Sequence, residues 1–279
     1  MTENTARALD HLVLPTANLD LARKRLGALG FTVAPQGVHP FGTTNACVYL
    51  ADGTFLEPLA IEDSASVETA AEGGNSFILR DRLFRGTYGD EGLSAVVFAT
   101  KDAEADHAAF VDAGISADPM VEFSRPSLDA AGRAGVASFR LAFASDGSPG
   151  AFLFTCERRK VPAIDRSTLE RHANGATRIT QIDAVAPDAD AFARFLAKAA
   201  NASVTADRKI ALSNGMLDVS EASQAADPRF TAVTFGIRDL AAVSALFNAN
   251  GIDYETRENA IRVPATAGQG VEFIFEETR

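Results

Sequence analysis

The chain has 279 residues, of which 47% are hydrophobic and 23% charged, the balance of a globular protein long enough for one large domain or two ordinary ones. Its net charge of −11, with no basic stripe, argues against nucleic acid as a partner. We find no signal peptide and no apolar run long enough to cross a membrane, so we expect a cytoplasmic protein. Cys47 and Cys156 are too few and too far apart to form a disulfide framework.

The first recognisable pattern covers Leu9–Ile61. It predicts a strand at Leu9–Leu14, followed by a helix from Asn18 to Gly30 whose apolar residues fall on one face. Three further strands are expected, at Phe31–Ala34, Ala46–Leu50 and Thr54–Ile61. The unit is therefore βαβββ.

The helix of this unit recurs at a fixed length in Asp102–Gly114 and Asp239–Gly251. Each copy begins with an N-cap residue, ends in glycine and leads into an apolar residue. A less regular copy follows the strand Ile179–Val185. The other expected strands are Leu93–Thr100, Val136–Ala144, Ala151–Cys156, Thr231–Ile237 and Val271–Phe275.

Two connectors separate the units. Glu62–Arg85 is rich in Ala, Glu and Ser, whereas Glu157–Asn174 is charged and contains Pro162. We expect two domains of two units each, with boundaries at residues 1–160 and 171–279.

Two polar residues interrupt the apolar strands of the first unit. His11 lies in its first strand and Glu57 in its last, within Phe55-Leu56-Glu57-Pro58-Leu59. An unpaired buried carboxylate would cost several kcal/mol, so Glu57 needs a hydrogen-bonding partner, a metal or water. The pair is the first candidate site.

The order of these motifs resembles the vicinal oxygen chelate superfamily, and within it the glyoxalase-like domain group. The resemblance is carried by Asp10-His11-Leu12-Val13, Leu29-Gly30-Phe31, Gly37-Val38-His39-Pro40-Phe41-Gly42-Thr43-Thr44-Asn45, the stretch from Tyr49 to Leu59, Phe123-Ser124-Arg125, Phe154-Thr155-Cys156 and His172-Ala173-Asn174-Gly175-Ala176. It implies an α+β fold in which paired βαβββ modules curl into cups. It also implies a divalent metal in the family's enzymes, which include isomerases, lyases and dioxygenases. Other members, such as bleomycin-resistance proteins, bind a small molecule without chemistry.

Only the first unit keeps both polar residues. Counting back from each N-cap, the position of His11 is occupied by Ala95, Gln181 and Ala232 in the other units. Aligned on the glycines before the closing strands, the position of Glu57 is occupied by Phe154, Val219 and Ile274. Zn, Fe, Ni or Mn sites generally use three or four protein ligands, so a metal at His11 and Glu57 would need to recruit His39 or Glu157.

We assign His11 and Glu57 as candidate catalytic residues and metal ligands. The candidate substrate-binding residues are His39, Asn45, Arg125 and His172. Each also has a structural interpretation. His11 can simply bond Glu57, His39 can shape a turn, Arg125 can form a surface salt bridge, and His172 can cap the entry to the C-terminal domain.

Three functions follow from these expectations. The first is an enzyme that acts on a small organic molecule as a metal-assisted lyase, isomerase or dioxygenase. The second is a metal-free, non-catalytic protein that binds a small molecule in the cup. The third makes the C-terminal pair a structural or dimerising domain, with a homodimer as the expected assembly. Nothing in the sequence indicates the substrate or a dependence on glutathione.

Overall fold

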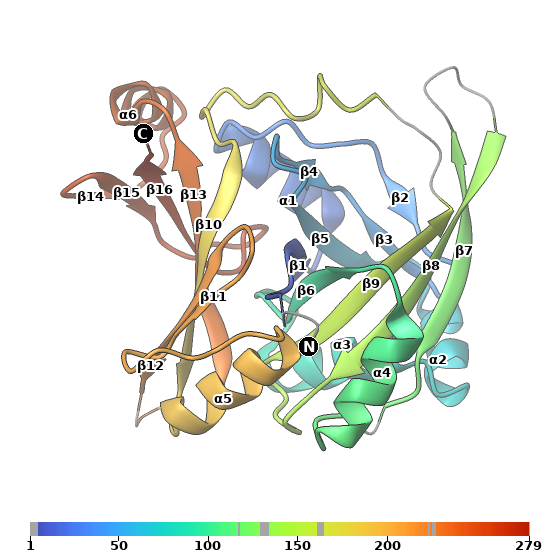
Figure 1. Ribbon diagram of the computed structural model, residues 1–279. Helices are drawn as coiled ribbons and strands as arrows, with labels where there is room; N and C mark the ends of the chain where they lie inside the picture. The colour runs from blue at the N-terminus through green and yellow to red at the C-terminus, as the bar shows by residue number, and fades with distance from the viewer. Residues whose placement is uncertain are drawn as a thin grey trace.

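A computed structural model describes residues 5–116, 118–128, 134–160, 165–222, 224 and 227–278. Two β-sheets dominate it, one of nine strands and one of seven (Figure 1). The first sheet and its helices comprise β1 Leu9–Pro15, α1 Leu19–Ala28, β2 Gly37–Val38, β3 Thr43–Asn45, β4 Val48–Tyr49, β5 Phe55–Ile61, α2 Ser64–Glu72, α3 Ser76–Tyr88, β6 Ala95–Thr100, α4 Ala103–Asp112, β7 Val121–Leu128, β8 Ala134–Ala144 and β9 Phe152–Lys160. The second comprises β10 Arg178–Ala186, α5 Ala189–Ala199, β11 Lys209–Ala211, β12 Met216–Glu221, β13 Arg229–Ile237, α6 Leu240–Ala249, β14 Glu255–Arg257, β15 Ala260–Val263 and β16 Glu272–Glu277.

The two sheets are built on the same plan. In the first, β1 and β6 pair antiparallel at the centre, and each pairs in parallel with the closing strand of its own unit, β5 or β9. In the second, β10 and β13 form the antiparallel centre, flanked by β12 and β16. This arrangement confirms the α+β fold of tandem βαβββ modules.

The helix repeat is also confirmed, including its irregular third copy. Gly30, Gly114 and Gly251 follow their helices with φ of 83°, 68° and 64°, in the left-handed region that glycine adopts without steric cost. After α5 the same backbone conformation occurs at Asn201, with φ 52°. Asparagine tolerates this region better than most residues, so the third unit stops its helix without glycine.

Three details of the predicted elements were wrong. Phe31–Ala34 forms no strand, and Phe31 instead packs on Phe235, with the ring centroids 5.2 Å apart. The connector Glu62–Arg85 contains two helices, α2 and α3. β7 covers Val121–Leu128, where the sequence analysis expected no strand. The predicted linker residue Pro162 lies outside the described residues.

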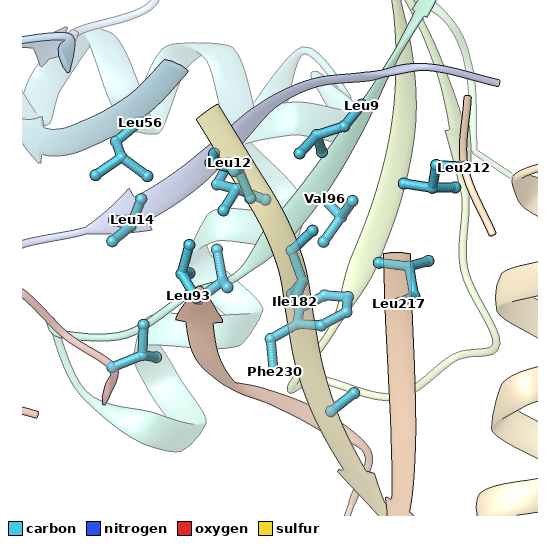
Figure 2. Close-up of a cluster of buried hydrophobic side chains, with 14 of the residues drawn as sticks. Leu9, Leu12, Leu14, Leu56, Leu93, Val96, Ile182, Leu212, Leu217 and Phe230 are labelled. Carbon is cyan, nitrogen blue, oxygen red and sulfur yellow. The ribbon is translucent and has the colours of Figure 1, made fainter. Parts of the chain in front are cut away.

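The two sheets pack against each other through one continuous hydrophobic core. Side chains alternate along a strand, so Leu12 and Leu14 of β1 point toward the second sheet while His11 and Val13 lie on the opposite face. Figure 2 shows Leu12 and Leu14 of β1 in the same buried cluster as Ile182 of β10. The opposite face of the first sheet is curved into a cup. None of the described helices is long and apolar enough to cross a membrane.

Candidate functional site

His11 is placed by an irregularity in β1. Between β1 and β6 the register shifts at Asp10, because Leu9 pairs with Phe98 while His11 pairs with Val97. Such a bulge re-aims the side chains beside it. The Asp10 carboxylate therefore reaches its neighbour's ring, with Oδ1 at 2.6 Å from Nδ1 of His11. Arg158 of β9 forms a bidentate ion pair with Asp10, in which Nη1 and Nη2 each donate to one carboxylate oxygen.

Glu57 lies on β5 and faces the other side of the His11 ring. Its Oε2 is 3.3 Å from Nε2 of His11, and its Oε1 accepts a 2.6 Å hydrogen bond from Nδ2 of Asn45. Only 7% of Glu57 is exposed. Burial raises its pKa, but the hydrogen bond and charge of His11, with smaller contributions from His39 and Asn45, lower the pKa to about 2. Glu57 is therefore ionised at neutral pH.

The two flanking carboxylates hold a proton on His11. Burial lowers the pKa of the imidazole, whereas hydrogen bonds to Asp10 and Glu57 raise it, and the net direction is upward. With a carboxylate facing each ring nitrogen, this arrangement favours the imidazolium form of His11. Its ring stacks on Phe55 at a centroid distance of 4.4 Å.

His39 joins this cluster in the opposite charge state. It precedes β3 in a turn, and its Nδ1 lies 2.9 Å from the hydroxyl of Thr43. Its Nε2 lies 3.4 Å from Nδ2 of Asn45 and 3.6 Å from Oε1 of Glu57. Burial lowers the pKa of His39 to about 4, so the ring is neutral at pH 7. An Nδ1–H tautomer that donates to Thr43 leaves Nε2 as an acceptor.

These polar groups line one side of a cavity of about 460 Å³. The rest of its wall is predominantly aromatic and aliphatic. The aromatic rings are those of Phe41, Tyr49, Phe55, Phe77, Phe123, Phe139 and Phe154. A concave apolar pocket with a few convergent polar groups is the usual form of a small-molecule site.

Five of the six predicted site residues meet in this cavity. His11, His39, Asn45, Glu57 and Arg125 all line it. His172 does not line it.

Both nitrogens of His172 bind backbone. Its Nδ1 accepts from the Thr32 amide at 3.0 Å, and its Nε2 lies 2.9 Å from the Tyr49 carbonyl oxygen. Burial lowers the pKa of His172. The side chain ties the segment after residue 165 to the first unit.

The sequence analysis missed Asp10, Arg158 and Arg166. Asp10 is adjacent to His11, but in a regular strand it would face the other way, and the bulge carries no sequence signal that we recognised. Arg166 comes from the segment that we expected to be only a linker, yet it lines the cavity. Glu157 does not reach the site; its Oε2 accepts from the backbone amide of Ala103 at 3.3 Å.

The strand registers test the alignment between units. His11 pairs with Phe55 in β1 and β5, as Ala95 pairs with Phe152 in β6 and β9, so the second unit has Phe154 at the position of Glu57.

The third unit requires a correction. Gln181 pairs with Met216, so Asp218, not Val219, occupies the position of Glu57. Asp218 lines a polar hollow of about 410 Å³ in the second sheet together with Asp183 and Glu272.

The described residues do not fit a divalent cation. No group of three or more His, Cys, Asp or Glu side chains among them is arranged to hold a metal ion. His11 presents no free lone pair, since both its nitrogens face carboxylates. Asn45 already occupies one oxygen of Glu57.

Comparisons with known proteins agree with this geometry. The profile of the family described as Glyoxalase-like domain matches residues 9–200, so the chain belongs to that family. Its fold is shared by solved structures of the vicinal oxygen chelate superfamily. No curated protein matches the sequence.

Several solved structures resemble the whole chain, among them the following three. A hypothetical protein from Staphylococcus aureus has a TM-score of 0.70 at 11% identity, over 97% of this chain and 99% of that one. A mutant of 4-hydroxymandelate synthase from Streptomyces coelicolor has a TM-score of 0.64 at 10% identity, over 98% and 93%. A Mn(II)-bound glyoxalase from Novosphingobium aromaticivorans has a TM-score of 0.53 at 11% identity, over 98% and 82%. At these identities the likeness establishes the fold alone.

Proposed function

We propose that the N-terminal cup binds a small organic molecule with a largely apolar body, and that the cluster of His11, His39, Asn45 and Glu57 contacts its polar end. The observation that carries this proposal is the cavity itself, which combines an aromatic wall with one compact polar cluster. Its volume of about 460 Å³ lies in the usual range for small-molecule sites.

The cluster offers a hydrogen-bond acceptor to such a molecule, because the nitrogens of His11 and Asn45 already face Asp10 and Glu57. Nε2 of the neutral His39 can accept a proton or hydrogen bond, whereas Asn45 and the His11 imidazolium hold the Glu57 carboxylate in place. Since their partners fix these side chains, a ligand meets preorganised groups, which reduces the ordering cost of binding.

A metal-assisted lyase, isomerase or dioxygenase is the second candidate. It is supported by the resemblance to a Mn(II)-bound glyoxalase. Against it stands the hydrogen bonding of the donors, which leaves His11 protonated and Glu57 occupied. We therefore favour metal-free binding.

A cavity-filling variant tests the first proposal. Ala137 lines the cavity from β8 and is 4% exposed, so Ala137→Phe should fill part of the space. Fragments that bind the wild type in ligand-observed NMR should lose binding to this variant, with circular dichroism reporting that the fold is retained. Equal binding to both proteins would place the ligand elsewhere and refute the proposal.

Elemental analysis separates the two candidates. Protein purified without chelator or affinity metal should contain far less than one equivalent of Zn, Fe, Ni or Mn. A near-stoichiometric metal that disappears in both His11→Ala and Glu57→Ala would establish the metal-dependent candidate instead.

A further inference from the structure

Three arginines line the cavity: Arg125, Arg158 and Arg166. They differ in whether an acidic residue pairs with them. Arg158 is paired with Asp10, and the His11 ring lies between Asp10 and Glu57. Arg125 and Arg166 also line the cavity, and neither makes an ion pair with any described residue.

Both unpaired guanidiniums are held against aromatic rings. The Arg166 guanidinium carbon lies 4.2 Å from the centroid of the Tyr49 ring, and that of Arg125 lies 5.6 Å from the centroid of Phe139. Cation–π contacts of this kind position a guanidinium and leave its N–H donors available in its own plane. Both side chains are half-buried.

The two arginines line the same cavity. Burial raises the pKa of Tyr49, which also lines it, and the positive charges of Arg166 and Arg125 both oppose that rise. Arg125 also reaches the polar cluster, because a methyl group added to Gly37 would meet both its Nη1 and Oδ1 of Asn45 at 2.5 Å.

The surrounding protein makes this local excess of positive charge informative. A chain with a net charge of −11 repels anions in general. The two unpaired guanidiniums make the electrostatic potential inside the aromatic cavity more positive than that of the surrounding protein. Guanidinium forks match carboxylate and phosphate oxygens, which favours an anion over a neutral ligand.

We propose that the cup selects an organic anion with an aromatic or similarly apolar body, and that Arg125 and Arg166 bind its carboxylate or phosphate group. This inference rests on the proposed binding function of the cup and adds the chemical class of its ligand. The apolar body lies among the phenylalanine rings while the anionic group faces the two guanidiniums.

Matched probes test the inference. The affinities of 3-phenylpropionate, phenyl phosphate and the neutral 3-phenylpropanamide would be measured by ligand-observed NMR. We expect at least one anion to bind about tenfold more tightly than the amide. Arg125→Gln and Arg166→Gln should each weaken that anion about tenfold and change the affinity for the amide less than twofold.

Arg82→Gln is the matched control, since Arg82 is exposed on α3 and pairs with Glu68. It should leave both affinities unchanged. If the amide binds as tightly as both anions, or if Arg125→Gln and Arg166→Gln weaken all probes equally, the anion inference is overturned while the binding cup stands. If no probe binds, both the inference and the proposed function on which it rests are contradicted.

Discussion

His11 and Glu57 meet because parallel neighbouring strands offset them by two residues. His11 pairs with Phe55, and Glu57 pairs with Val13, so both polar side chains lie on the cup face of the sheet. The offset leaves the His11 ring stacked on Phe55 with its Nε2 at 3.3 Å from Glu57. The register of β1 against β5 therefore sets both the stacking of His11 on Phe55 and its contact with Glu57.

The first prediction concerns the protonation of His11. Glu57→Gln removes one of the two carboxylates that raise the pKa of His11, so that pKa should fall. Long-range ¹H–¹⁵N NMR can follow it, because the chain has only four histidines. The variant should also lose about 2 kcal/mol in the free energy of unfolding, since a buried charge loses a partner. An unchanged His11 titration would show that Glu57 does not hold this proton.

The second prediction concerns stability between pH 6.5 and 4. A folded-state pKa of about 4 for His39 means that the unfolded chain binds a proton first as the pH falls. The free energy of unfolding should therefore decrease across this window, by up to about 3 kcal/mol for a fully buried ring. The raised pKa of His11 acts above this window, where its stabilisation is lost as the pH rises.

His39→Gln isolates that effect. Denaturant unfolding at several pH values should give a shallower loss of stability toward pH 4 than in the wild type. Equal slopes in the variant and the wild type would mean that His39 is not held neutral by burial.

The third prediction concerns the buried pair behind His11. Asp10→Asn leaves Arg158 and the His11 imidazolium without their shared carboxylate, so we expect a loss of about 3 kcal/mol in the free energy of unfolding. Arg158→Met should cost less, because the Arg158 side chain is 34% exposed. In the double variant the two costs should not add, which chemical denaturation would measure as a coupling energy.

Arg159→Met provides the comparison for that cycle. Arg159 is the next residue of the same strand but is 44% exposed and makes only distant ion pairs. Its replacement should change stability by less than about 0.5 kcal/mol. Additive effects of the Asp10 and Arg158 variants would contradict the pairing.

The fourth prediction uses the crowding at Gly37. A methyl group there would come within 2.5 Å of Arg125 and of Asn45, so Gly37→Ala should displace the guanidinium. We expect a loss of about 1–2 kcal/mol in stability and a weakening of anion binding, although no charge is removed. Gly27→Ala in α1 has open space around it and should be neutral or slightly stabilising. Unaltered anion binding in Gly37→Ala would show that the position of Arg125 is not important.

The central pair of the site, His11 and Glu57, could be predicted from the sequence, because a charged residue within an apolar strand needs a partner. Glu57 was recognisable for that reason, and His11 because it lies in the matching strand. Asn45 and Arg125 were found through the family resemblance. Asp10 was not found, because a strand of period two places it on the opposite face and only the bulge brings it to His11.

Register was the other source of error. In the third unit, alignment on glycine selected Val219, but a glycine before a strand marks a turn and does not fix the pairing. A shift of one residue exchanges the two faces of a strand, so the buried Val219 was taken for the position that Asp218 holds. The helices α2 and α3 were missed because the Ala- and Ser-rich connector shows no clear apolar face.

The segment after residue 165 has a consequence for how this protein can be divided. His172 fastens it to Thr32 and Tyr49, and Arg166 and Leu169 then close one side of the cavity. A fragment that stops at residue 160 would lack this wall and expose the leucines that face the second sheet. The cavity therefore depends on residues beyond 160. Engineered fragments or domain exchanges that cut at the expected linker should leave the cavity open on one side and expose apolar surface.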